Sequence, residues 1–278
     1  MMQDSLYYRP IPQDQGGRWP LAGGWTRFTH LECLQRGAAP RIVDSAPDRV
    51  MVALTAPRPS VLGLTLDRPR LMGIVNATPD SFSDGGRYDP ATQARALAAD
   101  GADLLDIGGE STRPGAEEIA VPDEIARILP AIDAARGLLP ISVDTRKAAV
   151  AQAALAAGAG MVNDVSGFDF DAGLAPLVAG AGVPVCLMHA QGLPATMQDD
   201  PRYDDVLLDV YDALAARIDR AVRAGIPADR IVIDPGIGFG KTEAHNLAIL
   251  RRISLYHGLG CPILLGVSRK RFIGRIGG

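Results

Sequence analysis

The sequence predicts an α/β protein built as a (β/α)8-type barrel that is incomplete, with seven βα units and no eighth strand. From residue 71 onward, short apolar runs alternate with alanine-rich helical stretches, a pattern typical of βαβ units around a parallel sheet. Polar residues follow each apolar run, at the strand ends that converge on one pocket in a TIM barrel. No GxGxxG motif follows the first run, which disfavours a doubly wound dinucleotide-binding sheet.

The elements are expected in strict alternation. Each predicted strand is a short apolar run, and each predicted helix is a longer stretch rich in alanine. The expected strands are residues 71–75, 104–107, 140–143, 161–162, 183–188, 231–233 and 263–267. The expected helices are residues 91–100, 123–136, 147–157, 172–179, 205–224 and 243–253.

Residues 1–60 differ from this pattern, since they hold seven prolines and both tryptophans without a long periodic segment. We interpret them as an irregular N-terminal extension packed on the main domain, with a partly disordered arm as the alternative. Residues 61–278 would form the barrel domain. Within it, residues 61–70 alternate apolar and polar and predict a short strand or hairpin that closes the bottom of the barrel.

Composition excludes several classes of function. The chain has 278 residues, 47% hydrophobic and 22% charged, with a net charge of −4, so no nucleic-acid-binding surface is indicated. No apolar run reaches the roughly 18 residues of a membrane span, and the first residues lack the apolar core of a signal peptide. Cys33, Cys186 and Cys261 lie far apart, which favours reduced thiols in a cytoplasmic protein.

A dense group of oxygen-bearing side chains follows the first strand. Asn76, Thr78, Asp80, Ser81 and Asp84 lie within a short loop that also holds Pro79 and Phe82. This density favours a loop that binds an oxyanion or a magnesium ion at the mouth of the barrel.

Two further segments predict an anion site. After the second strand, Thr112 and Arg113 stand side by side in a glycine-bounded loop, and a guanidinium fork suits a phosphate. The alternative is an arginine paired with a nearby acid. After the seventh strand, Ser268 and Lys270 precede a predicted helix, whose first N–H groups could hold a carboxylate or a phosphate.

Asp144 and Asp234 each end an apolar strand, where an unpaired carboxylate is costly to bury. A ligand with several ring N–H donors would satisfy both acids, and Asn163 adds an amide that both donates and accepts. The alternative is an ion pair of Asp144 with Arg146 and of Asp234 with Lys241. Residues 234–242 superficially suggest a P-loop but fail its spacing, so their glycines more plausibly let the backbone approach a flat ligand.

One group of charges is interpreted as a solvated helix face. Acidic residues begin the fifth long helix and arginines follow in its later turns: Asp204, Asp205, Asp209, Asp212, Arg217, Arg220 and Arg223.

These motifs together resemble the dihydropteroate synthase family of pterin-binding enzymes. The most specific stretches are MGIVNATPDSFSDGG (72–86) and DIGGESTRPG (106–115), and four more follow in the family's order at 141–146, 163–167, 234–241 and 266–270. The resemblance implies condensation of 6-hydroxymethyl-7,8-dihydropterin diphosphate with 4-aminobenzoate, giving 7,8-dihydropteroate and diphosphate, with Mg²⁺ required.

Residue roles follow from the same resemblance. Asn76 would bind magnesium, and Thr112 and Arg113 would hold the diphosphate. The pterin would contact Asp144, Asn163, Asp234 and Lys270. Ser268 would lie near the aminobenzoate carboxylate, under Pro79 and Phe82. Arg113, Asp144 and Lys270 would be the catalytic residues, and the family implies a homodimer when the protein is full length.

One departure concerns the eighth strand, which in the family carries an Arg-x-His anion site. The chain ends at Gly278, so we expect strands one and seven to present unpaired edges. We interpret the chain as truncated. A pterin-binding methyltransferase domain and a non-catalytic pterin-binding fragment are the alternative functions.

Overall fold

The computed structural model describes residues 5–77, 90–111, 118–192, 200–268 and 270–277. Four of the predicted site residues, Pro79, Phe82, Thr112 and Arg113, lie outside the described residues.

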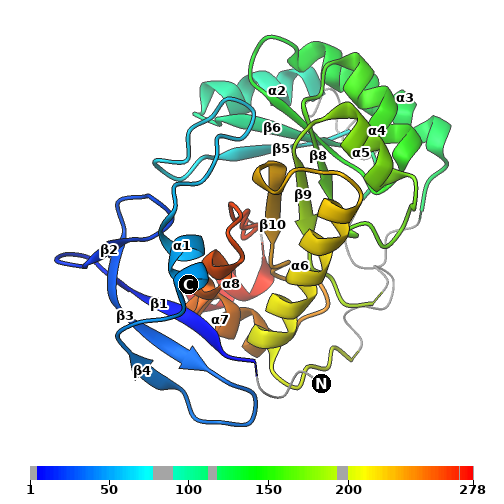
Figure 1. Cartoon of the computed structure of the whole chain (residues 1–278). Coiled ribbons are helices and arrows are strands. Elements are labelled where there is room, and N and C mark those ends of the chain that lie inside the picture. The colour runs from blue at the N-terminus through cyan, green and yellow to red at the C-terminus, as the bar shows by residue number, and fades with distance from the viewer. Residues whose placement is uncertain (1–4, 78–89, 112–117, 193–199, 269, 278) are drawn as a thin grey trace.

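A six-stranded parallel sheet forms the centre of the molecule (Figure 1). Its strands neighbour one another in the order β10-β9-β8-β7-β6-β5, so each strand lies beside the next in sequence, as in a barrel wall. Their bounds are β5 (Met72–Asn76), β6 (Leu104–Gly108), β7 (Ile141–Asp144), β8 (Met161–Asp164), β9 (Val185–Met188) and β10 (Ile231–Asp234). The predicted order and type of these six strands are confirmed.

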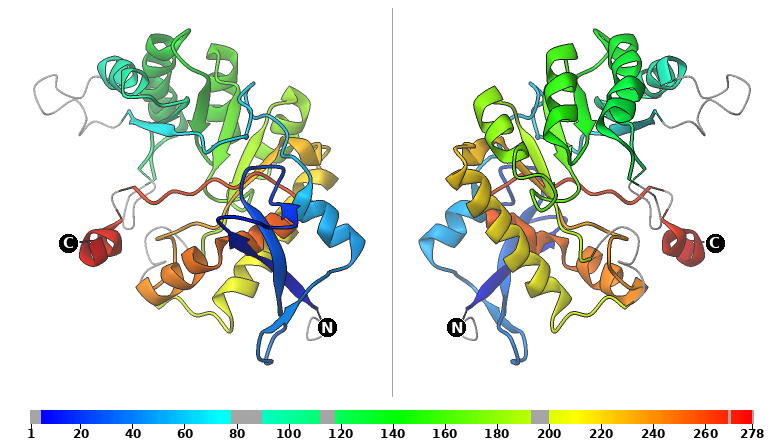
Figure 2. Two further views of the ribbon diagram at one scale, coloured as in Figure 1. Left: turned by 90° about the vertical axis from the view of Figure 1, so that its left-hand side faces the viewer. Right: turned by 90° about the vertical axis from the view of Figure 1, so that its right-hand side faces the viewer.

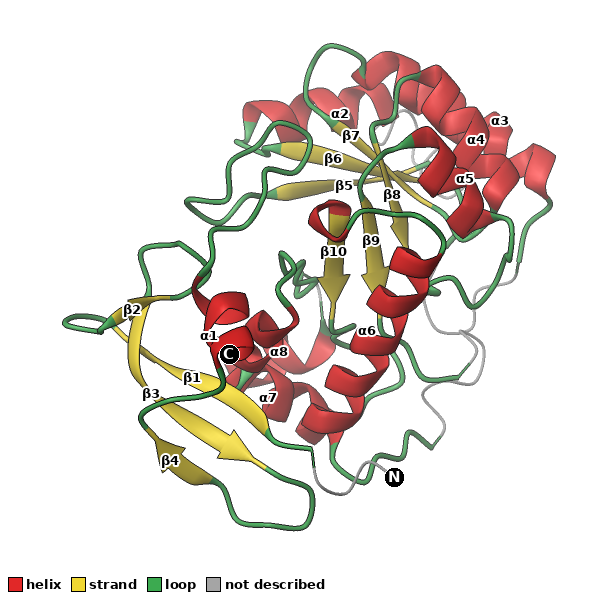
Figure 3. Ribbon diagram, in the orientation of Figure 1, coloured by secondary structure: helices red, strands yellow, loops and turns green. Residues whose placement is uncertain are grey.

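Helices cover the outer face of this sheet (Figure 3). They are α2 (Pro90–Ala99), α3 (Val121–Ala135), α4 (Ala148–Ala157), α5 (Leu174–Ala181) and α6 (Val206–Arg223), and the next helix, α7 (Glu243–Arg251), contacts α6. Local chemistry sets their ends: the Asp205 side chain accepts from the N–H groups of Leu207 and Leu208, and Thr242 forms a capping box with His245. Gly158 ends α4 in a left-handed conformation at φ 115°.

The barrel is open between β5 and the segment after β10. Within the described residues β5 pairs only with β6, and Leu71 and Ile74 are exposed. The predicted strand at residues 263–267 is wrong: the segment makes a single parallel bridge, from Ile263 to Ile233. No described strand lies on its other side, so most of its backbone lacks a ladder to join. The expected unpaired edge of the first strand is therefore confirmed, whereas no seventh strand forms among the described residues to present the other.

The prediction that residues 1–60 form an irregular extension is also wrong for the described residues. Four antiparallel strands form an N-terminal sheet, with β3 pairing with each of the others, followed by helix α1 (Asp48–Thr55). The strands are β1 (Tyr7–Gln13), β2 (Trp19–Pro20), β3 (Arg27–Leu34) and β4 (Arg41–Val43). Prolines 10 and 12 fall in β1, which pairs only with β3 and shifts register between them, a placement that an edge strand tolerates.

Charged contacts join the N-terminal sheet to α6. The Tyr7 hydroxyl donates to Asp212 at 2.8 Å, and Arg36 pairs with Asp209 and Asp212 at 2.5 and 2.7 Å. On the same helix, Arg217 bonds Asp169 at 2.9 Å. The interpretation as a solvated face is therefore wrong for Asp209, Asp212 and Arg217, whose side chains are largely buried in these ion pairs. Asp204 and Arg223 are exposed, as expected.

Two short segments complete the fold. The predicted hairpin at 61–70 appears as a bridge between Val61 and Leu64, and Leu62 packs with Met161 and Val232 near the bottom of the barrel. After the 3₁₀ segment η3 (Ile253–Leu259) and the extended residues 263–267, helix α8 (Arg271–Gly277) lies beside α7 (Figure 2). No described helix is long and apolar enough to cross a membrane.

Candidate functional site

Four polar side chains gather where the parallel strands end. Asp106 lies within β6, and Asp144, Asn163 and Asp234 lie at or near the ends of β7, β8 and β10. The register aligns Asp144 with Gly108 on one side and with Asn163 on the other. Asn163 donates from Nδ2 to Asp106 Oδ2 at 2.9 Å. The structure therefore brings together three residues predicted from the sequence and adds Asp106.

The ion pairs considered for Asp144 and Asp234 do not form. Arg146 instead bonds Glu110 at 2.9 Å, and Lys241 bonds carbonyl oxygens and the ring of His189. Oδ1 of Asp144 and Oδ1 of Asp106 are buried without a hydrogen-bond partner in the described structure. Such atoms cost free energy unless a ligand satisfies them.

Burial and crowding shift the acids toward their protonated forms. Burial raises the pKa of Asp144 well above its ordinary value, and the nearby carboxylates of Asp106 and Glu124 raise it further. Burial also raises the pKa of Asp106 and brings the pKa of Asp234 to about 6, although Gly236 N–H, Lys241 and Lys270 oppose that rise. A ligand that donates N–H groups would reverse these shifts, because it favours the ionised carboxylates.

Lys270 lies next to the acid group, near Asp234. Its Nζ is 4.5 Å from the centroid of the Phe239 ring, and burial lowers its pKa while Asp234 raises it. Ser268 is exposed near the same end of the open segment. Asn76 ends β5, paired in register with Gly108, and its side chain is exposed. The predicted residues within the described structure thus all lie near the carboxyl ends of the strands.

A buried charge network fixes both sides of the segment that contains Thr112 and Arg113. Lys147 Nζ donates to Glu110 at 2.6 Å, to Glu124 at 2.8 Å and to the carbonyl of Ile119 at 2.6 Å. The Ile119 N–H in turn donates to Glu110 at 3.0 Å. Opposite charges in this geometry offset the cost of burial, so residues 110 and 119 are held at the start of α4.

The sequence reasoning missed the roles of Asp106, Glu110 and Lys147. An available signal was the acid within the apolar run at 104–107, since a carboxylate inside a buried strand needs a partner. The pairing of Lys147 with Glu110 had no local signal, because 37 positions separate them.

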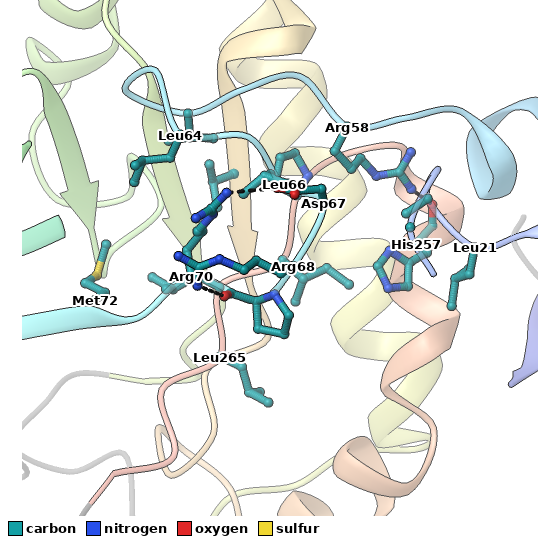
Figure 4. Close-up of a pocket in the computed structure, with 18 of the residues that line it drawn as sticks. Leu21, Arg58, Leu64, Leu66, Asp67, Arg68, Arg70, Met72, His257 and Leu265 are labelled. Atoms are coloured by element: carbon teal, nitrogen blue, oxygen red, sulfur yellow. Dashed lines mark hydrogen bonds and ion pairs between the residues drawn. The ribbon is translucent and has the colours of Figure 1, made fainter. Parts of the chain in front are cut away.

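A separate cavity of about 400 Å³ lies at the opposite ends of the strands (Figure 4). Its lining is mostly apolar and includes the first residues of three strands, Met72, Leu104 and Met161. The charged side chains at its edge bond other residues: Arg70 and Arg68 both reach Asp103. We therefore place the candidate active site at the acid group, where buried carboxylates lack partners.

Comparison with known proteins gives a consistent result. Residues 72–277 match the pterin binding enzyme family. The chain is 45% identical over 209 residues to the dihydropteroate synthase of Bacillus subtilis, covering 73% of this chain and 71% of that protein. It is 46% identical over 209 residues to a probable bifunctional folylpolyglutamate synthase/dihydropteroate synthase of Haloferax volcanii, covering 73% of this chain but only 25% of that longer protein.

Solved structures agree. Dihydropteroate synthase of Xanthomonas albilineans with 4-aminobenzoic acid has a TM-score of 0.73 and 50% identity, covering 81% of this chain and 82% of that one. The same enzyme in complex with 7,8-dihydropteroate has a TM-score of 0.69 and 46% identity, covering 80% and 82%.

Proposed function

Because this chain belongs to the pterin-binding enzymes and within them to the dihydropteroate synthase family, we propose that it is a dihydropteroate synthase. It would condense 6-hydroxymethyl-7,8-dihydropterin diphosphate with 4-aminobenzoate to give 7,8-dihydropteroate and diphosphate. The observation that carries the proposal is the acid group, in which Asp106 and Asp234 are buried, Asp144 is half-buried with a buried Oδ1, and none bonds a cation in the described structure.

The acid group suits the edge of a pterin ring. That edge presents several N–H donors, and ionised carboxylates are pure acceptors. Asp144 and Asp234 would accept from the ring, while Asn163, held by Asp106 at 2.9 Å, would both donate and accept. Lys270 would lie against the same ligand, positioned by the Phe239 ring.

The reaction needs charge stabilisation more than a nucleophile. The C–O bond between the pterin methylene and the diphosphate breaks, the arylamine nitrogen forms the new C–N bond, and one amine proton is released. As the methylene carbon becomes cationic, the carboxylates of Asp144 and Asp234 would favour that charge. Thr112 and Arg113 are proposed to hold the departing diphosphate and Ser268 the aminobenzoate carboxylate, with Pro79 and Phe82 above it.

A magnesium ion fits the donors at hand only in part. Asn76 offers a hard amide oxygen of the kind Mg²⁺ prefers, but in the described part of the chain no three His, Cys, Asp or Glu side chains are arranged so that they could hold a metal ion. Mg²⁺ would therefore take most of its ligands from diphosphate and water, as it commonly does at phosphate sites. When bound, it would neutralise charge on the leaving diphosphate.

Two properties are proposed from the family rather than from the site. We infer a cytoplasmic location, which the three buried free thiols Cys33, Cys186 and Cys261 suit. We infer that the protein is a homodimer.

The direct test is to incubate the purified chain with both substrates and Mg²⁺ and to measure 7,8-dihydropteroate by chromatography. We expect product that depends on 4-aminobenzoate, and we expect Asp144→Asn to lower turnover by about 100-fold or more while the fold is retained. Methyl transfer to a corrinoid without condensation would establish the rival methyltransferase. Pterin binding without any condensation would leave a non-catalytic pterin-binding protein.

A further inference from the structure

Lys241 is a buried cation that bonds no acid. The residue is 3% exposed, and among the described residues its ammonium bonds no carboxylate. Nζ instead lies 2.9 Å from the carbonyl oxygen of Gly236, 3.0 Å from that of Phe239 and 2.9 Å from Nδ1 of His189. We propose that Lys241 is a positioning residue, which fixes the glycine loop (residues 235–240) and through it Asp234 and Phe239 for pterin binding. This inference rests on the proposed function.

The path of the glycine loop explains why a donor is needed beneath it. Gly236 has φ +68°, and a Cβ atom there would lie 1.9 Å from the carbonyl oxygen of His189. Gly240 has φ +59°, and a Cβ atom there would lie 2.4 Å from the carbonyl oxygen of Gln191. The loop therefore lies directly on the segment after β9, with carbonyl groups turned inward. Buried carbonyl groups require donors, and Lys241 supplies them from the end of the loop.

The loop in turn holds two groups of the proposed pterin site. The Gly236 N–H donates to Asp234 Oδ1 at 2.7 Å, which sets the orientation of that carboxylate. The Phe239 ring lies under Lys270 Nζ at 4.5 Å. A displaced loop would thus move the acid and the lysine that face the ligand, although Lys241 itself need not touch it.

The charged groups around Lys241 and Asp234 lead to a second consequence. Lys241 faces Asp234, Lys270, Arg217 and His189. Burial lowers the pKa of Lys241 to about 7, Asp234 opposes this, and Arg217 and Lys270 add to it. The pKa of His189 falls to about 2, mainly through burial, so its ring is neutral and Nδ1 can accept from the ammonium. Removing the Lys241 cation would raise the pKa of Asp234, because only the Gly236 N–H and Lys270 would then oppose the effect of its burial.

The test is calorimetric titration of the full chain and of Lys241→Met with 6-hydroxymethylpterin between pH 5 and pH 8. We expect the variant to bind at least 10-fold more weakly near neutral pH, and the loss of affinity on acidification to begin at a higher pH than in the wild type. In the condensation assay, KM for the pterin should rise more than kcat falls. Lys241→Arg keeps the positive charge but not the compact ammonium donor. Compared with Lys241→Met, it should therefore bring the pH dependence of pterin binding closer to that of the wild type than it brings the affinity.

Arg58→Met is the matched control. Arg58 is a half-buried cation that also bonds carbonyl oxygens, those of Ala53, Ala56 and His257, but it lies at the opposite end of the barrel. Its loss should lower thermal stability and leave pterin affinity within about twofold. Should Lys241→Met not fold, Lys241→Gln takes its place, since it lacks the charge but keeps a donor. Wild-type affinity and an unchanged pH profile in the Lys241 variant would overturn the positioning role, whereas a wild type that binds no pterin would instead refute the proposed function.

Discussion

Replacing Asp234 by Asn is expected to stabilise the free protein while it abolishes pterin binding. The pKa of Asp234 is raised from 3.8 to about 6, chiefly by burial. Each pKa unit corresponds to about 1.4 kcal/mol, so the ionised side chain costs roughly 3 kcal/mol of folding free energy near neutral pH. Asn removes that cost, and its Oδ1 can still accept from the Gly236 N–H. Since the new amide N–H₂ group lacks an evident partner, we expect a net gain of about 1–3 kcal/mol.

The pH dependence gives the sign of the effect. An acid whose pKa is raised in the folded state binds a proton more tightly there than in the unfolded chain, so the wild type loses stability as the pH rises from about 4 to about 6. Below pH 3.8 the carboxyl group is protonated in both states and the penalty is absent. The gain in Asp234→Asn should therefore be near zero at pH 4, grow up to pH 6 and stay constant above it.

Urea unfolding of the two proteins at pH 4 and pH 7.5 measures this gain. Asp169→Asn is the matched control, because the same chemical change falls on an acid whose pKa is lowered. Burial would raise that pKa, but hydrogen bonds from Arg217 and Arg220 outweigh it, so this variant should lose stability at pH 7.5. The reasoning fails if Asp234→Asn is less stable than the wild type at pH 7.5, or if its gain is the same at both pH values.

Three other outcomes follow from the same contacts. Asn163→Ala should lower the free energy of unfolding by about 1–3 kcal/mol in urea titrations and weaken pterin binding, since Asp106 would lose its donor at 2.9 Å; unchanged stability would contradict that role. Pterin binding near pH 6 should release protons, because Asp234 has a pKa of about 6 and must ionise to accept from the ring; calorimetry in buffers of different ionisation enthalpy detects this, and no buffer dependence would count against it. Tyr7→Phe should lower the thermal midpoint, because the hydroxyl donates to Asp212 at 2.8 Å and such a bond to a charged group is worth about 1.5–3 kcal/mol; an unchanged midpoint would show that this contact does not hold the N-terminal sheet.

The sequence predicted the barrel wall and most of the acid group because both leave local signals. Apolar runs such as 231–233 mark buried strands, and the acid that ends such a run must lie at the carboxyl edge. Asp144, Asn163 and Asp234 could therefore be assigned to one site before any geometry was known, since parallel strands end at the same edge.

The remaining features depend on contacts between distant residues. The N-terminal sheet was missed because Pro10 and Pro12 argue against a strand, and only pairing with β3 makes an edge strand possible. The sequence left an ion pair of Asp234 with Lys241 as an alternative, because it shows which charges are near in the chain, whereas the fold gives Lys241 the carbonyl oxygen of Gly236 instead. Residues 263–267 have the composition of a strand but lack a second neighbour to complete one.

The most direct test of the pterin site is a crystal structure of the chain with bound 6-hydroxymethylpterin. The ring should lie against Asp144, Asn163 and Asp234, with both carboxylates accepting from its N–H groups at hydrogen-bond distance. A ring bound instead in the cavity near Met72 and Leu104, with the acid group left without a ligand, would contradict the account.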